Sequence, residues 1–120
     1  MDERLEKALE FSNYMVTLNN QKRLIKEKYY EDLIYFSNGA QFIVTKELIN
    51  LVGFMIDRDN TKDVVIIDDN EIPVMISDLT EFYENIVDVY FSASNTYYRS
   101  YNDLKTKRRI EKLVDYDPEN

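Results

Sequence analysis

The sequence predicts an α+β fold in which two long antiparallel helices form an arm, closed at one end by a small head of one short strand, a buried helix and a β-hairpin. Apolar residues recur at intervals of three and four over residues 4–36 and again over residues 79–114, a spacing that places them on one face of a helix. Between these runs, residues 40–77 contain short β-branched and aromatic stretches separated by turn-forming residues. We therefore expect a single domain over residues 1–120, with the head at about residues 40–77.

The first long helix is expected from about Arg4 to Phe36, which corresponds to roughly 50 Å of helix. Asparagine and glycine adopt the left-handed conformation that ends helices, so the sequence predicts a stop at Asn38 and Gly39. The apolar stripe of this helix comprises Ala8, Phe11, Met15, Leu18, Ile25, Tyr29, Leu33 and Phe36.

The head begins with a predicted strand at Gln41–Val44, a β-branched and aromatic run. Thr45 is a suitable N-cap for a second helix from Lys46 to about Arg58. Because apolar residues occur on nearly every side of this helix, we expect it to be the buried element of the head.

A β-hairpin is expected next, because two apolar runs, Val64–Ile67 and Ile72–Ile76, flank the turn-forming stretch Asp68–Glu71. Pro73 has no backbone N–H and therefore favours an edge position for the second strand.

The last long helix is expected from about Leu79 to Val114, and its start is marked by Asp78 and by Glu81 three residues later, in the manner of a capping box. If the two long helices pair in one chain, Glu6 and Glu3 come to lie near Arg108 and Lys112. This match of charges favours an intramolecular hairpin. Two other arrangements stay open: the helices can pair between chains, or the charges can simply be solvated.

Catalysis is not expected, because the 120-residue chain contains no histidine and no cysteine. It therefore lacks the commonest general base, the commonest zinc ligand and any thiolate nucleophile. We expect no catalytic residue, no cofactor and no small-molecule substrate. No apolar stretch approaches the roughly 18 residues of a membrane span, and the charged start is unlike a signal peptide, so no membrane contact is expected.

Acidic residues dominate the middle of the chain, whose formal net charge is −8. Ten acidic residues lie between Asp57 and Asp88, against only Arg58 and Lys62. Such a surface repels phosphate backbones, so nucleic acid is not an expected partner.

Part of this acidic stretch resembles a calcium-binding loop, with oxygen ligands at alternating positions from Asp57 to Asp63 and again at Asp68. Lys62 occupies the position that requires glycine, and Asp68 stands where a bidentate glutamate is needed. The sequence therefore predicts an acidic loop and no metal site. The neighbouring carboxylates of the predicted turn, up to Glu71, are expected to be solvated rather than catalytic.

Tyrosine is unusually frequent, with ten among 120 residues. In the last helix, tyrosines spaced by seven form a stripe that is expected to line the seam between the long helices, whereas Phe91 and Tyr98 lie one helical step away and are expected to be exposed. Aromatic side chains are enriched at protein contacts, although simple core packing is the alternative explanation. The candidate interface residues are Tyr90, Phe91, Tyr97, Tyr98 and Tyr101.

Four segments, ALEFSNYMVTLNNQKR, LIYFSNGAQFIV, VVIIDDNEIPVMISDL and KTKRRIEKLVDYD, resemble a family of small uncharacterised proteins of T-even-like myoviruses, the cyanophages that infect marine cyanobacteria. The resemblance spans nearly the whole chain. It implies a phage origin and a location in the host cytoplasm during infection or in the virion, and it implies no activity or catalytic residue.

Taken with the exposed aromatics, these features predict a non-catalytic phage structural or assembly protein that contacts a second copy or another phage protein through its helical arm. The alternative is a host-directed regulatory protein that binds a basic host partner through its acidic head.

Overall fold

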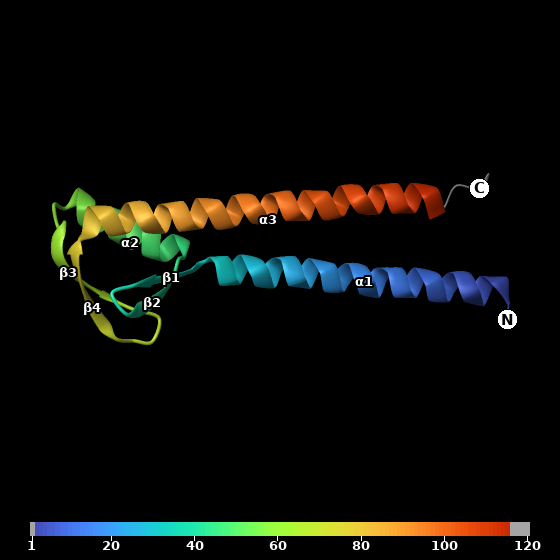
Figure 1. Cartoon of the computed structure of the whole chain (residues 1–120), viewed down its shortest axis with the longest axis horizontal. Helices are drawn as coiled ribbons and strands as arrows, with labels where there is room; N and C mark the ends of the chain where they lie inside the picture. The colour runs from blue at the N-terminus through green and yellow to red at the C-terminus, as the bar shows by residue number, and fades with distance from the viewer. Residues whose placement is uncertain (1, 116–120) are drawn as a thin grey trace. The chain divides into compact units, whose positions relative to one another are not determined.

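The computed structural model describes the backbone of residues 2–115 and the side chains of residues 2–107. Within this part of the chain the fold is α+β, with three helices and two separate two-stranded antiparallel sheets (Figure 1). The elements are α1 (Glu3–Asp32), β1 (Ile34–Ser37), β2 (Ala40–Ile43), α2 (Lys46–Asp57), β3 (Lys62–Ile67), β4 (Pro73–Asp78) and α3 (Leu79–Asp115).

The chain divides into two compact units. We call Tyr29–Thr96 the core unit, because it holds both sheets, α2 and the first half of α3. The helical unit consists of Met1–Lys28 and Tyr97–Asn120, and therefore contains most of α1 and the second half of α3.

The prediction that the first helix continues to Phe36 is wrong, because α1 ends at Asp32. The next residues form β1, which pairs with β2 so that Tyr35 faces Phe42 across the ladder. Asn38 and Gly39 connect the strands with φ angles of 54° and 76°. Two consecutive positive φ angles characterise the type I′ turn of a tight hairpin, for which Asn-Gly is the preferred sequence. Asn-Gly therefore closes a hairpin here and does not end a helix.

Helix α2 confirms the predicted position, and its first turn is capped as expected. The backbone N–H of Leu48 donates to Thr45 Oγ1 at 3.1 Å. The expectation that α2 is buried on nearly every side is wrong: Val52 is fully buried, but Leu51 and Phe54 are 45% and 60% exposed. A unit this small covers only one face of the helix, so the apolar residues on the other face remain in contact with water.

Strands β3 and β4 confirm the predicted hairpin, with Val65 opposite Met75 and Ile67 opposite Pro73. The buried carboxylate of Asp68 organises its turn, because Oδ1 accepts hydrogen bonds from the backbone N–H groups of Asn70 at 2.9 Å and Ile72 at 2.8 Å. In Figure 1 this turn lies at the end of the β3–β4 hairpin that is farther from the start of α3.

Helix α3 begins at the predicted residue. The backbone N–H of Glu81 donates to Asp78 Oδ1 at 3.2 Å, which confirms Asp78 as the N-cap. The N–H of Leu79 also donates to the carbonyl of Thr61 at 2.8 Å, so the loop before β3 helps to fix the start of the helix.

The hydrophobic core lies in the core unit, between the inner faces of the two hairpins, α2 and the first turns of α3. The ring of Phe82 makes edge contacts with Tyr35 and Phe42, with centroids 6.0 and 5.1 Å apart. Asn85 Nδ2 donates to the Tyr35 hydroxyl at 3.0 Å, which satisfies that polar group at the margin of the core. The buried cluster comprises Leu33, Ala40, Phe42, Val44, Val52, Ile66, Ile76, Leu79, Phe82, Ile86 and Ala93.

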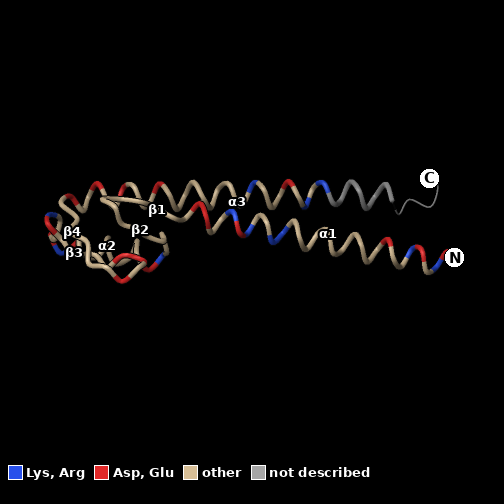
Figure 2. Tube along the Cα trace, turned by 60° about the horizontal axis from the view of Figure 1, so that its bottom comes forward, with Lys and Arg blue, Asp and Glu red and all other residues tan. Residues whose placement is uncertain are grey.

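The helical unit buries much less. Among its described side chains, Leu18 of α1 and Leu104 of α3 are buried, with 3% and 9% exposure. Figures 1 and 2 both show the described residues of the two segments of this unit side by side. The charges expected to align them, those of Arg108 and Lys112, lie outside the described side chains.

Candidate interaction surfaces

The candidate interface residues of α3 fall in both units. In the core unit, Tyr90 is half-buried against the hydrophobic cluster, whereas its neighbour Phe91 is 59% exposed. Their rings meet edge to face with centroids 6.1 Å apart. The Phe91 ring therefore packs against Tyr90 on one side, and its other side is exposed to water, as the helical spacing predicts.

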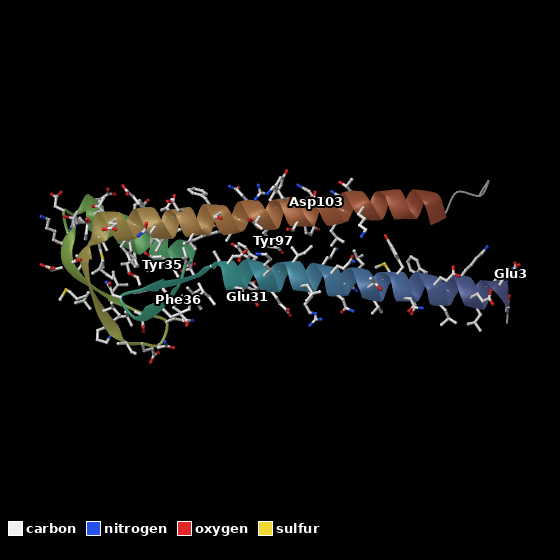
Figure 3. All side chains as sticks on the ribbon, in the orientation of Figure 1. Glu3, Glu31, Tyr35, Phe36, Tyr97 and Asp103 are labelled. Carbon is white, nitrogen blue, oxygen red and sulfur yellow. The ribbon has the colours of Figure 1, made fainter. Side chains whose placement is uncertain are left out.

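In the helical unit, Tyr97 is half-buried and Tyr98 is 70% exposed. Tyr101, which the spacing places in the seam, is 42% exposed. Figure 3 labels Tyr97 on α3. The exposure predicted for Tyr98 is confirmed, and the role of these residues in a contact stays a prediction.

A second apolar stripe on α1 was not anticipated from the sequence. Leu5, Leu9 and Val16 are all about half exposed. At about 100° per residue they lie within roughly 40° of one another and roughly opposite Leu18. Their spacings of four and seven residues are a recognisable helical signal, which the stronger stripe through Leu18 obscures.

The outer faces of both hairpins are also apolar and exposed. On β3 and β4, Val65, Ile67 and Met75 have exposed fractions of 48%, 58% and 56%. On β1, Phe36 is 70% exposed while Tyr35 points to the core, in keeping with the alternation of side chains along a strand; both are labelled in Figure 3. The sequence does not predict these exposed outer faces, because a continuous apolar run such as Val64–Ile67 is typical of a strand covered on both faces.

Charge is divided unevenly between the units. The core unit carries 13 acidic and three basic side chains, a formal charge of −10, whereas the helical unit carries ten acidic and 12 basic ones, a formal charge of +2. Figure 2 shows the resulting excess of acidic residues around the sheets and α2. The net acidity of the chain is therefore a property of the core unit.

A shallow recess of about 160 Å³ lies in the core unit between the β1–β2 turn and the start of α3. Two of its polar groups are already engaged: Asp78 Oδ1 accepts the helix cap, and Asn85 donates to Tyr35. Sites for organic ligands usually enclose about 300–1,000 Å³. The recess is therefore smaller than the usual site for an organic ligand. It is lined by Tyr35, Ser37, Asn38, Ile76, Ser77, Asp78, Glu81, Phe82 and Asn85.

The acidic stretch that resembles a calcium loop is not assembled as one. Asp57 ends α2, whereas Asp68 is turned into the β3–β4 turn and accepts two backbone N–H groups there. Among the described residues, no three carboxylates are grouped so that they could hold a metal ion.

None of the described helices combines the length and the apolar character that crossing a membrane requires. No family model matches the chain, and comparisons with curated proteins and with solved structures find no similar protein. The resemblance to cyanophage proteins therefore stays a prediction from the sequence.

Proposed function

We propose that this chain is a non-catalytic protein that acts through contacts of its helical arm, formed by α1 and α3, with a second copy or with another protein of the same phage, as a structural or assembly component. We further propose that its two long helices pair antiparallel within one chain as an arm that the sheets and α2 close at one end. The observation that carries the proposal is the exposure of large apolar side chains in the helical unit.

Burial in this unit is small for helices of such length. Long helices in proteins owe most of their stability to packing of an apolar face, because propensity alone leaves them marginal. Two described side chains of the helical unit are buried, whereas Leu5, Leu9 and Val16 leave an apolar stripe on α1 in contact with water, and exposed apolar patches commonly mark contact sites. Its exposed large apolar residues are Leu5, Leu9, Phe11, Val16, Leu24, Tyr98 and Tyr101.

The phage setting is supported by the sequence resemblance alone. It suggests a partner that is made in the infected cell, and a place of action in the host cytoplasm or the virion. Mass spectrometry of purified virions tests this directly, because a structural component is present at a fixed copy number.

Sedimentation velocity over a range of concentrations tests the contact. We expect a dimer or larger assembly at micromolar concentration, weakened by Tyr98→Glu and by Phe91→Glu with unchanged helical content in circular dichroism. Thr106→Glu is the matched control, because it adds the same charge to an exposed site on α3 without removing an aromatic ring. A strict monomer at high concentration, together with unaltered capture of phage proteins by both variants, would contradict the proposal.

A second function is favoured by the charge of the core unit. Its formal charge of −10, combined with apolar outer sheet faces, suits a basic partner such as a host protein that the chain regulates. Binding of a basic partner should weaken as salt is raised and should weaken when Asp57, Asp59 and Asp63 are changed together to asparagine. Salt-independent binding would count against this second function.

A further inference from the structure

The outer edge of β3 carries backbone groups without partners. The N–H of Asp68 donates to the carbonyl of Ile72 at 2.9 Å, so these two residues form a hydrogen-bonded pair of the antiparallel ladder. Such pairs alternate with pairs whose N–H and C=O groups point away from the neighbouring strand. Val65 and Ile67 occupy these alternate positions. Among the hydrogen bonds of the described residues, none engages their outward backbone groups.

The side chains at the same edge form an apolar surface. Val65 and Ile67 are about half exposed, and Met75 lies directly across from Val65. An added strand could therefore gain backbone hydrogen bonds from the edge and apolar contacts from the outer face at the same time.

The opposite edge of this sheet is less suited to pairing. Pro73 lies across from Ile67 in β4 and has no N–H to offer an incoming strand. Proline on an edge strand is a common obstacle to further pairing, and β3 has no equivalent. The two edges of the hairpin thus differ, and β3 is the open one.

Charge identifies the kind of segment that fits. Asp63 comes two residues before Val65, and Asp69 comes two residues after Ile67. The N–H of Asp69 already donates to the Gln41 carbonyl of β2 at 2.9 Å, so the unpaired part of the edge ends before Asp69, and a carboxylate lies at each end of that part. The whole core unit has a formal charge of −10. A segment with lysine or arginine at its ends and alternating apolar residues between them matches this arrangement in both charge and pattern.

We propose that the β3 edge binds an extended basic segment of a partner protein as a third strand of the β3–β4 sheet. The inference rests on the second function proposed above, binding of a basic partner by the core unit, and adds the mode and the site of that binding.

The test uses the full chain and a fluorescent heptapeptide, Lys-Thr-Val-Thr-Val-Thr-Lys, with blocked ends. We expect saturable binding in fluorescence anisotropy, with slowed exchange of the Val65 and Ile67 amides in NMR. Methylating the backbone nitrogens of the five central peptide residues should weaken binding at least about tenfold, because it removes donors to the edge.

Proline substitutions compare the two edges. Val65→Pro removes an outward N–H without removing a bond of the β3–β4 ladder, so it should weaken binding at least about tenfold. Met75→Pro is the matched control at the facing position and should leave binding unchanged. Val65→Lys provides the same test if the proline variant does not fold, because it keeps the backbone and places a repelling charge at the edge.

A control peptide of equal charge, made only of lysine and glycine, distinguishes strand addition at the β3 edge from binding of a basic partner by charge alone. If it binds as tightly as the probe, or if the methylated probe binds as well as the parent, strand addition is overturned and charge-driven binding stands. If neither basic peptide binds, both proposals fail.

Discussion

The core unit and the helical unit differ sharply in how much of their apolar surface they bury. The core unit encloses a continuous cluster of eleven buried hydrophobic residues, whereas the described side chains of the helical unit include two buried ones. Burial contributes roughly 25 cal/mol for each Å² of apolar surface removed from water. Apolar packing therefore stabilises the core unit more than the helical unit, whose long helices have few buried side chains to hold them.

The largest expected effect comes from Phe82→Ala, which removes the ring that joins Tyr35 and Phe42. Truncation of a buried phenylalanine usually lowers the free energy of unfolding by about 3–5 kcal/mol. Urea unfolding followed by circular dichroism measures it. Phe91→Ala, on the same helix but exposed, should cost no more than about 0.5 kcal/mol. Equal losses for the two variants would show that the core is not organised around Phe82.

A smaller effect is expected from Leu18→Ala, the corresponding change in the helical unit. Because few side chains near Leu18 are buried, the loss of stability should appear as local opening of α1 and not as global unfolding. Amide exchange within α1 should accelerate about tenfold, or about 1.4 kcal/mol, with exchange in β2 and α2 unchanged. Faster exchange in both units would show that they unfold together, which contradicts the distinction drawn here.

The smallest effects, of opposite sign, are expected at the two glycines, both in the core unit. Gly39 has a φ of 76°, so Gly39→Ala should destabilise by about 1 kcal/mol through left-handed strain. At Gly53 an added Cβ would lie 3.6 Å from the Tyr83 ring, an ordinary contact, so Gly53→Ala in α2 should stabilise by about 0.5–1 kcal/mol. Thermal unfolding measures both, and a loss at Gly53 would reveal a tighter α2–α3 contact than the structure shows.

Much of the fold follows from local sequence signals. Thr45 and Asp78 cap their helices as expected, and the turn after Ile67 closes the expected hairpin. The first hairpin is missed because Leu33 and Phe36 continue a three-and-four spacing, although Asn38-Gly39 is itself a strong hairpin signal. At this position the turn preference of Asn38-Gly39 determines the structure, and the helical spacing of apolar residues does not.

The candidate surfaces were less predictable than the fold. Helical spacing correctly marks Phe91 and Tyr98 as exposed, because it depends only on position around one helix. The open edge of β3 depends on which strands become neighbours, and the run Val64–Ile67 reads equally well as a strand covered on both faces. Only the structure shows that the sheet has two strands and leaves Val65 and Ile67 uncovered.

The hairpins also have a consequence for folding kinetics. Ladder partners in the first, such as Ile34 and Ile43, are nine residues apart, and short hairpins form in about 1–10 μs. The bonds that join separate elements span far more chain: 28 residues from Gln41 to Asp69 and 50 residues from Tyr35 to Asn85. Closing long loops costs entropy before distant contacts are made, which slows folding. We therefore expect the docking of α3 onto already formed hairpins to be the slow step in refolding of the core unit.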